Sequence, residues 1–181
     1  GTYLVAAAIT GGKLTLEQVE PGHMEAVLGQ LEKVGLRLER GDGWIRAGLA
    51  GALRAVDLST APYPGFPTDL QAQYMVLMSQ AGGRSRLEET IFEQRFMHVP
   101  ELRRMGAAIE LDGRTAEVSG PTPLLGAEVT ASDLRASASL VLAGLAARGE
   151  TLVHRLYHLD RGDEGIEQKL SRLGARVERL S

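Results

Sequence analysis

The sequence predicts an α/β (α+β) fold built from three copies of one unit. Segments of nine residues end alike at three places: LEKVGLRLE (residues 31–39), LRRMGAAIE (residues 102–110) and LSRLGARVE (residues 170–178). Their glycines are about 70 residues apart, which is longer than a solenoid repeat of two helices. The copies therefore cover approximately residues 1–50, 56–120 and 125–181 of a single domain, residues 1–181.

Each copy is predicted to open with an apolar helix, over residues 3–9, 70–80 and 134–147, followed by glycine. A strand is expected after the glycine that ends each of these helices, over residues 14–19, 85–92 and 151–159, because apolar residues there alternate or occur consecutively.

A second helix and a short strand complete each copy. Residues 23–34, 99–105 and 164–173 place apolar side chains at helical spacing, and the shared glycine is the expected left-handed cap. Final strands are predicted at residues 36–39, 108–111 and 176–179, with partner strands at residues 44–47 and 115–119. The unit is β-α-β-α-β-β, and the first copy lacks its first strand.

Three such units can bury their helices against one another and leave the sheets outside. We therefore expect pseudo-threefold packing with helices inside. A single doubly wound sheet remains the alternative, because helix and strand predictions do not determine how units pack.

Composition excludes several classes of protein. A hydrophobic share of 44% excludes disorder and collagen, and the net charge of −3 argues against binding to polyanions through bulk charge. The chain has no cysteine, hence no disulfide and no thiolate site, which fits a cytoplasmic location. No apolar stretch reaches the length that spans a bilayer. We expect no nucleic acid, membrane, metal or cofactor as a partner.

Two aspartates stand at equivalent places in copies two and three. TDLQAQ (residues 68–73) aligns with SDLRAS (residues 132–137), so Asp69 and Asp133 each lie at the entrance to a first helix. One interpretation is helix capping, since a short carboxylate accepts hydrogen bonds from free backbone N–H groups. The other is a ligand site, because helix N-termini attract anions and an aspartate can accept a proton or a sugar hydroxyl. Both can hold at once.

Three arginines are candidates for binding an anion. Aligning IFEQRF (residues 91–96) with YHLDRG (residues 157–162) puts Arg95 and Arg161 at matching strand ends, and Arg135 lies one turn into a helix. A lone arginine is usually a solvated or salt-bridged surface group. Two equivalent arginines together with Arg135 favour an anion clamp, because guanidinium binds phosphate and carboxylate in bidentate fashion.

Other chemical motifs are missing from the sequence. The four histidines, His23, His98, His154 and His158, form no HExxH and no neighbouring ligand set. Neither a glycine-rich nucleotide loop nor a GxSxG elbow is present, so the sequence supports neither chemistry.

Four long motifs occur in order: PYPGFPTDLQAQ (residues 62–73), IFEQRFMHVPEL (residues 91–102), DLRASASLVLAG (residues 133–144) and YHLDRG (residues 157–162). Together they closely resemble the C-terminal lobe of the UDP-N-acetylglucosamine 1-carboxyvinyltransferase family. The resemblance covers essentially the whole chain. It implies the enolpyruvyl transferase fold, an inside-out α/β barrel lobe. It also implies transfer of the enolpyruvyl group of phosphoenolpyruvate to the 3′-hydroxyl of UDP-N-acetylglucosamine, the first committed step of peptidoglycan synthesis.

The resemblance also implies roles for individual residues. Asp69 would contact the sugar 3′-hydroxyl as general base, and Ile91 and Phe92 would contact the UDP-sugar. Arg95, Arg135 and Arg161 would bind phosphoenolpyruvate, and Arg161 would also be a catalytic residue. Asp133 and Leu134 would lie at the same floor of the site.

In that family a second lobe carries the remaining substrate-binding groups. The resemblance therefore implies a missing N-terminal lobe as partner, and we expect this chain alone to have negligible transferase activity. The start at Gly1, beside an apolar stretch, agrees with a piece of a longer polypeptide. Two alternatives stay open: a 5-enolpyruvylshikimate-3-phosphate synthase-like transferase and a non-catalytic isolated domain. An RNA-end-processing enzyme on a related repeat would need a catalytic histidine and a nucleotide site, and the sequence shows neither.

Overall fold

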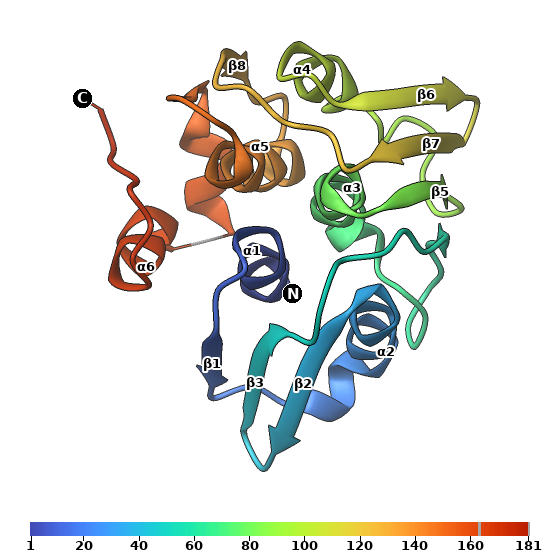
Figure 1. The fold of residues 1–181 in the computed structure, drawn as a ribbon, viewed down its shortest axis with the longest axis vertical. Coiled ribbons are helices and arrows are strands. Elements are labelled where there is room, and N and C mark those ends of the chain that lie inside the picture. Colours follow the sequence, from blue (N-terminus) through green and yellow to red (C-terminus); the bar gives the residue numbers. More distant parts are fainter. Residues whose placement is uncertain (163, 181) are drawn as a thin grey trace.

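Three separate sheets surround a central group of helices in the computed structural model, which describes residues 1–162 and 164–180 (Figure 1). Helices α1 (Thr2–Thr10), α3 (Gln71–Gln80) and α5 (Leu134–Ala146) come one from each copy and pack against one another. The prediction that helices lie inside is confirmed. The alternative of one doubly wound sheet is wrong.

The first copy forms a three-stranded antiparallel sheet in the order β1-β3-β2. Its elements are β1 (Leu14–Glu17), the 3-10 helix η1 (Pro21–Met24), α2 (Glu25–Val34), β2 (Leu36–Gly41) and β3 (Trp44–Leu49). Helix α2 buries its apolar face and ends at Gly35, whose φ of 125° is positive as predicted.

The second copy carries a four-stranded sheet in the order β4-β5-β7-β6, with β4 parallel to β5. Its elements are β4 (Leu58–Ser59), η2 (Thr68–Leu70), α3, β5 (Gly83–Glu88), α4 (Val99–Arg104), β6 (Ala108–Asp112) and β7 (Thr115–Gly120). The strand expected over residues 85–92 ends at Glu88. There it pairs with Thr115, the first residue of β7, so the partner strand extends no further.

The third copy has a two-stranded parallel sheet. Its elements are β8 (Glu128–Thr130), α5, β9 (Leu152–His154), the 3-10 helix η3 (Leu156–Arg161) and α6 (Ile166–Arg172). The strand predicted over residues 151–159 is wrong beyond His154, because Arg155 adopts φ 62° and turns the chain into η3. The strand predicted at residues 176–179 is also wrong, since no described strand pairs with that segment.

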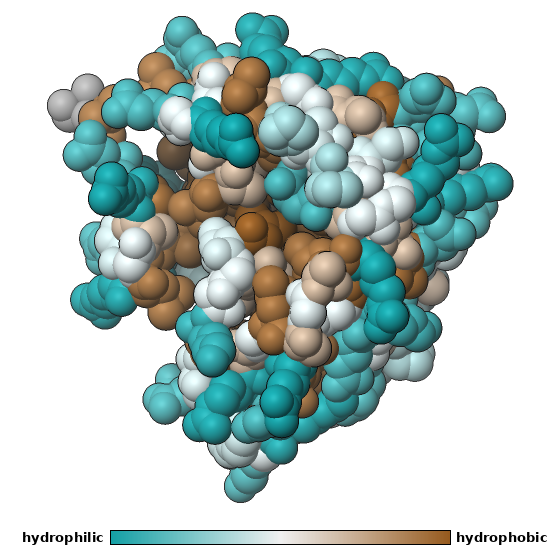
Figure 2. Space-filling view, viewed as in Figure 1, coloured by the Kyte–Doolittle hydropathy of each residue, from teal (hydrophilic) through white to brown (hydrophobic). Residues whose placement is uncertain are grey.

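Helix α3 is the most enclosed element of the core. Every residue from Gln71 to Ser79 is buried, because α1, α5 and the second sheet cover it on different sides. On the face shown in Figure 2, apolar side chains gather across the middle of the molecule. A hollow of about 460 Å³ opens there between α1, α5 and α6, and its walls include Ala6, Ala7, Leu14, Leu145, Leu170 and Leu173.

Candidate functional site

The segment that leads into α3 is closed on itself and fixed to the core. Ala61 N donates to the Phe66 carbonyl at 2.9 Å, and the Phe66 ring meets the Tyr74 ring edge-on at 5.5 Å between centroids. Tyr74 is fully buried, and its hydroxyl donates to the Val56 carbonyl at 2.7 Å. Burial raises the pKa of Tyr74 above its usual range, so the phenol stays a neutral donor. The turn that carries Asp69 therefore sits on a rigid base.

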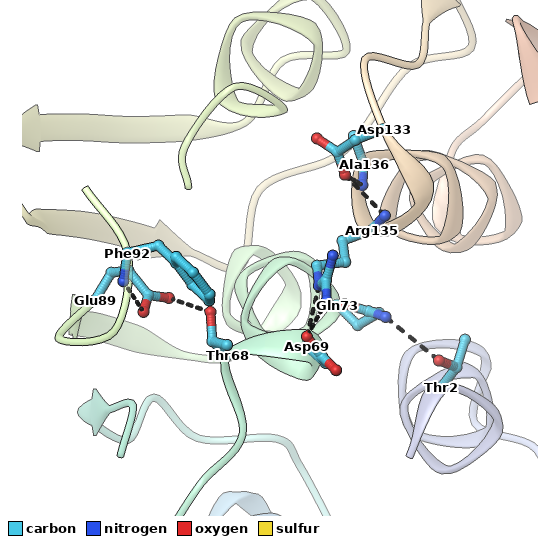
Figure 3. A network of polar contacts seen from close by, with 9 residues as sticks. All are labelled: Thr2, Thr68, Asp69, Gln73, Glu89, Phe92, Asp133, Arg135 and Ala136. Atoms are coloured by element: carbon cyan, nitrogen blue, oxygen red, sulfur yellow. Dashed lines mark hydrogen bonds and ion pairs between the residues drawn. The ribbon is translucent and has the colours of Figure 1, made fainter. Parts of the chain in front are cut away.

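Asp69 and Arg135 meet across the entrances of α3 and α5 (Figure 3). The Arg135 Nε donates to Asp69 Oδ1 at 2.7 Å, and Nη2 of the same guanidinium contacts the same oxygen. The Asp69 side chain is 67% exposed. Its Oδ2 has no hydrogen-bond donor among the described residues, so this oxygen is open to a ligand hydroxyl.

Asp133 caps α5. Its Oδ1 accepts from the backbone N–H of Arg135 at 2.8 Å and of Ala136 at 3.0 Å, and Oδ2 accepts from the Ser132 hydroxyl at 3.1 Å. Partial burial opposes ionisation of Asp133. The bonds from Ala136, Ser132 and Arg135 outweigh that effect, so the pKa of this carboxyl lies below its usual range. The capping interpretation is confirmed for Asp133.

For Asp69 the capping interpretation is wrong. The residue lies within the 3-10 turn η2, and Leu70, with φ −109° and ψ 1°, occupies the N-cap place of α3. No side chain caps either η2 or α3. Because its helix begins through this turn, the Asp69 carboxylate points away from the backbone N–H groups and toward Arg135.

His98 lies near the capped entrance of α5 and is 3% exposed. Burial lowers the pKa of its imidazole to about 4, although the charge of Asp133 acts in the opposite direction. Its Nε2 has no hydrogen-bond partner among the described residues. His98 is therefore neutral at pH 7.

The segment after β5 carries the predicted sugar-contacting residues. Phe92 is 47% exposed, and the Arg95 guanidinium carbon lies 4.1 Å from the centre of its ring, a cation–π contact. The prediction that Arg95 stands at a strand end is wrong, because β5 ends at Glu88 and Arg95 follows in an irregular loop.

Leu134 and Arg161 lie where η3 packs on α5. A Cβ on Gly162 would lie 2.7 Å from the end of the Leu134 side chain, so these two residues approach closely. Arg161 is exposed and ends η3, so its predicted place at a strand end is wrong as well.

The neighbouring Asp160 pairs with Arg179 at 2.6 Å. Hydrogen bonding from Arg179 lowers the pKa of Asp160.

The structure thus brings Asp69, Arg135 and Asp133 together and places Leu134 beside them. Arg95 lies in the loop after β5 and Arg161 at the end of η3, and within the described residues neither bonds to Asp69 or Arg135. No group of three or more His, Asp or Glu side chains in residues 1–162 and 164–180 is arranged to hold a metal ion.

One buried acid was missed by the sequence reasoning. Glu89 is 1% exposed and bonds to Thr60, Thr68 and the backbone at Ile91. Ser85 and Leu87 are buried and alternate with exposed residues, so the pattern continues inward to position 89. An acid at an inward position of the strand predicted over residues 85–92 was the available signal.

A cavity of about 300 Å³ opens beside Asp69. Its walls are mainly apolar and come from the start of α1, from η1 and α2, and from residues 63–73. Gln73 also lines it, and its buried Oε1 has no hydrogen-bond partner among the described residues. The Asp69 carboxylate therefore adjoins a space that a small polar ligand could enter.

No helix in the described part of the chain is long and apolar enough to cross a membrane.

The fold and this site define a lobe of the enolpyruvyl transferase type. A sequence profile of EPSP synthase (3-phosphoshikimate 1-carboxyvinyltransferase) matches residues 1–170, and the chain belongs to this family. More particularly, it is 55% identical over its whole length to a UDP-N-acetylglucosamine 1-carboxyvinyltransferase of Idiomarina loihiensis. It is 57% identical over 99% of its length to one of Gluconacetobacter diazotrophicus. The chain spans 43% of the length of each relative.

Solved structures agree on the fold. The enolpyruvyl transferase NikO from Streptomyces tendae superposes with a TM-score of 0.86 at 28% identity, over 98% of this chain and 43% of that one. An EPSP synthase from Acinetobacter baumannii gives a TM-score of 0.60 at 19% identity, over 84% of this chain and 38% of its own length. The predicted inside-out lobe is confirmed.

Proposed function

We propose that the protein to which this chain belongs transfers the enolpyruvyl group of phosphoenolpyruvate to the 3′-hydroxyl of UDP-N-acetylglucosamine and releases phosphate. The contact between Asp69 and Arg135 carries the proposal, because it puts a carboxylate and an anion-binding guanidinium side by side at the mouth of a cavity. The names of relatives at 55–57% identity support this choice of substrates.

In this reaction Asp69 acts as general base through its open Oδ2. It takes the proton of the 3′-hydroxyl while that oxygen bonds to C2 of phosphoenolpyruvate, and C3 takes a proton from an acid that the proposed N-terminal lobe would supply. The bond between C2 and the phosphate oxygen then breaks, C3 returns its proton to that group, and inorganic phosphate leaves with the proton that Asp69 had taken.

Arg135, Arg95 and Arg161 would hold the phosphate and carboxylate of phosphoenolpyruvate. Arg135 is closest to the reacting hydroxyl because it already contacts Asp69. Arg95 is held over Phe92, and Arg161 is exposed at the end of η3. Bidentate guanidinium contacts would stabilise the charge that moves to the phosphate in the transition state. Ile91, Phe92, Asp133 and Leu134 would shape the floor of this site.

The chain supplies one half of the site. It spans 43% of the length of its curated relatives, and we propose that an N-terminal lobe provides the remaining groups. The chain alone would then release no phosphate above background, whereas the full-length protein would. We also propose a cytoplasmic location, which agrees with the absence of cysteine from the chain.

A titration of UDP-N-acetylglucosamine into this chain tests the site directly, with Asp69→Ala as the matched control. Binding that weakens in the variant supports a preformed sugar-nucleotide subsite on this lobe. If millimolar ligand does not bind, the subsite exists only when both lobes meet. The full-length protein then becomes the object of the assay.

A 5-enolpyruvylshikimate-3-phosphate synthase-like activity is the second candidate, because the family profile carries that name. Phosphate release by the full-length protein distinguishes the two. With phosphoenolpyruvate present, UDP-N-acetylglucosamine should support turnover and shikimate 3-phosphate should not. The reverse result would overturn the proposed substrate.

A further inference from the structure

Glu89 is a buried acid outside the residues assigned to substrate. The residue is 1% exposed, and its carboxylate accepts four hydrogen bonds. Oε1 accepts from the Thr60 hydroxyl at 2.8 Å and from the backbone N–H groups of Ile91 at 3.0 Å and Phe92 at 3.4 Å. Oε2 accepts from the Thr68 hydroxyl at 2.9 Å.

These four bonds join two segments that are separate in sequence, and Figure 3 shows the bonds from Thr68 and Phe92. Thr68 precedes Asp69 in the turn η2, whereas Ile91 and Phe92 follow β5. Thr60 reinforces the link from the side of β4, because its hydroxyl oxygen accepts from Thr90 N at 2.9 Å. The Glu89 carboxylate therefore fixes the turn η2, which carries Asp69, relative to the segment of Ile91 and Phe92 that is expected to contact the sugar.

An ionised carboxylate suits this task because it only accepts hydrogen bonds, and all four of its partners donate. Glu89 has no ion pair within the described residues, so donors alone stabilise its buried charge. A buried carboxylate that lost a donor would be poorly compensated, and both segments would be free to shift. Small displacements of a reacting group lower turnover steeply.

We propose that Glu89 is a positioning residue for the transferase reaction, an inference that rests on the proposed function. Acting through the Thr68 hydroxyl, it holds Asp69 at a fixed distance from the segment of Ile91 and Phe92. The sugar hydroxyl that these residues hold is thereby presented to Asp69 Oδ2.

The test uses the full-length protein and a matched pair at Thr68. Thr68→Val keeps the shape and removes the hydroxyl, whereas Thr68→Ser keeps the hydroxyl. We expect kcat for phosphate release to fall roughly tenfold or more in the valine variant and to stay within about threefold of wild type in the serine variant. Equal kcat in valine and wild type overturns the proposal.

A second matched pair keeps the proposal falsifiable if the valine variant folds poorly. Glu89→Asp retains the charge but withdraws the carboxylate by one methylene, and Glu88→Asp makes the same change at the exposed neighbouring position. Glu89→Asp should lower kcat about tenfold or more, and Glu88→Asp should leave it within about twofold. A wild-type kcat in Glu89→Asp overturns the proposal.

A double-mutant cycle separates positioning from general damage to the fold. If Glu89 acts through Asp69, Thr68→Val should lower kcat much less in an Asp69→Asn background than in wild type. Additive effects would mean that the base is not what Glu89 positions, and would overturn the proposal.

The cycle also distinguishes the two levels of inference. An Asp69→Asn variant with wild-type kcat removes the base and overturns the proposed function and the role of Glu89 together. A strong loss in Asp69→Asn with no loss in Thr68→Val overturns the role of Glu89 alone.

Discussion

The entrances of α3 and α5 occupy equivalent places in the second and third copies, yet their aspartates make different contacts. Asp133 Oδ1 accepts from two backbone N–H groups of α5, whereas Asp69 Oδ1 accepts from the side chain of Arg135. The difference comes from the 3-10 turn η2, which moves Asp69 away from the capping place. A short change in how a helix begins thus frees a carboxylate for chemistry.

The comparison predicts its largest effect on turnover. In the full-length protein, Asp69→Asn should lower kcat roughly 100-fold or more, because an amide cannot take the hydroxyl proton. Asp133→Asn should cost less than about tenfold, since asparagine is as good an N-cap as aspartate. Steady-state phosphate release checks both variants. Equal losses would mean that the two aspartates do not differ in chemistry.

A second prediction concerns the buried imidazole near Asp133. The pKa of His98 is lowered to about 4, so the unfolded chain binds the proton first as pH falls below about 6.5. The free energy of unfolding should therefore fall as pH drops from 6.5 to 4, on the order of 3 kcal/mol in total. Urea unfolding at several pH values measures this slope.

The matched variants for that slope are His98→Gln and His23→Gln. His98→Gln should remove most of the slope between pH 6.5 and 5, above the range in which the aspartates and glutamates titrate. His23→Gln should retain it, because His23 is exposed. A slope that survives in His98→Gln would show that another group titrates there.

A third prediction concerns stability at the capped entrance. Asp133→Ala should lower the free energy of unfolding by about 1 kcal/mol at pH 7, because two N–H groups of α5 lose their acceptor. The pKa of Asp133 is depressed in the folded state, so this advantage is present above the ordinary value and is lost as pH falls through the folded one. Chemical unfolding at pH 7 and pH 3 checks both statements. A difference that widens at pH 3 would contradict them.

The smallest effect is expected for stability at the other entrance. Asp69→Ala should change the free energy of unfolding by less than about 0.5 kcal/mol, because the carboxylate is largely exposed and caps no helix. Thermal unfolding beside Asp133→Ala makes the comparison. A loss as large as that of Asp133→Ala would mean that the pair with Arg135 holds the fold together.

Periodicity was sufficient to predict the helices and most strands. The first helices were placed almost to the residue, since their apolar runs and following glycines are local signals. Gly106 and Gly174 have φ of 101° and 97°, which confirms the expected positive φ at the shared glycine. These features depend only on neighbouring residues.

Strand pairing depends on residues that are distant in sequence, and the predictions made from local patterns failed there. Residues 176–179 alternate like a strand, but no described strand is available to pair with them. Alternation also could not reveal that Arg155 would turn the third copy into η3. The same limit applies to Asp69, whose role depends on the turn before α3 and on Arg135, 66 residues away.

The enclosure of α3 has a consequence for how the site can adapt. Amide protons along a helix buried on all sides exchange with solvent only when the whole domain unfolds. Helix α3, which follows Asp69, therefore does not move when the chain opens locally. Adjustment to a ligand therefore has to come from the loop after β5 and from η3. Differences in substrate preference between relatives should arise in the same two segments, while α3 stays fixed.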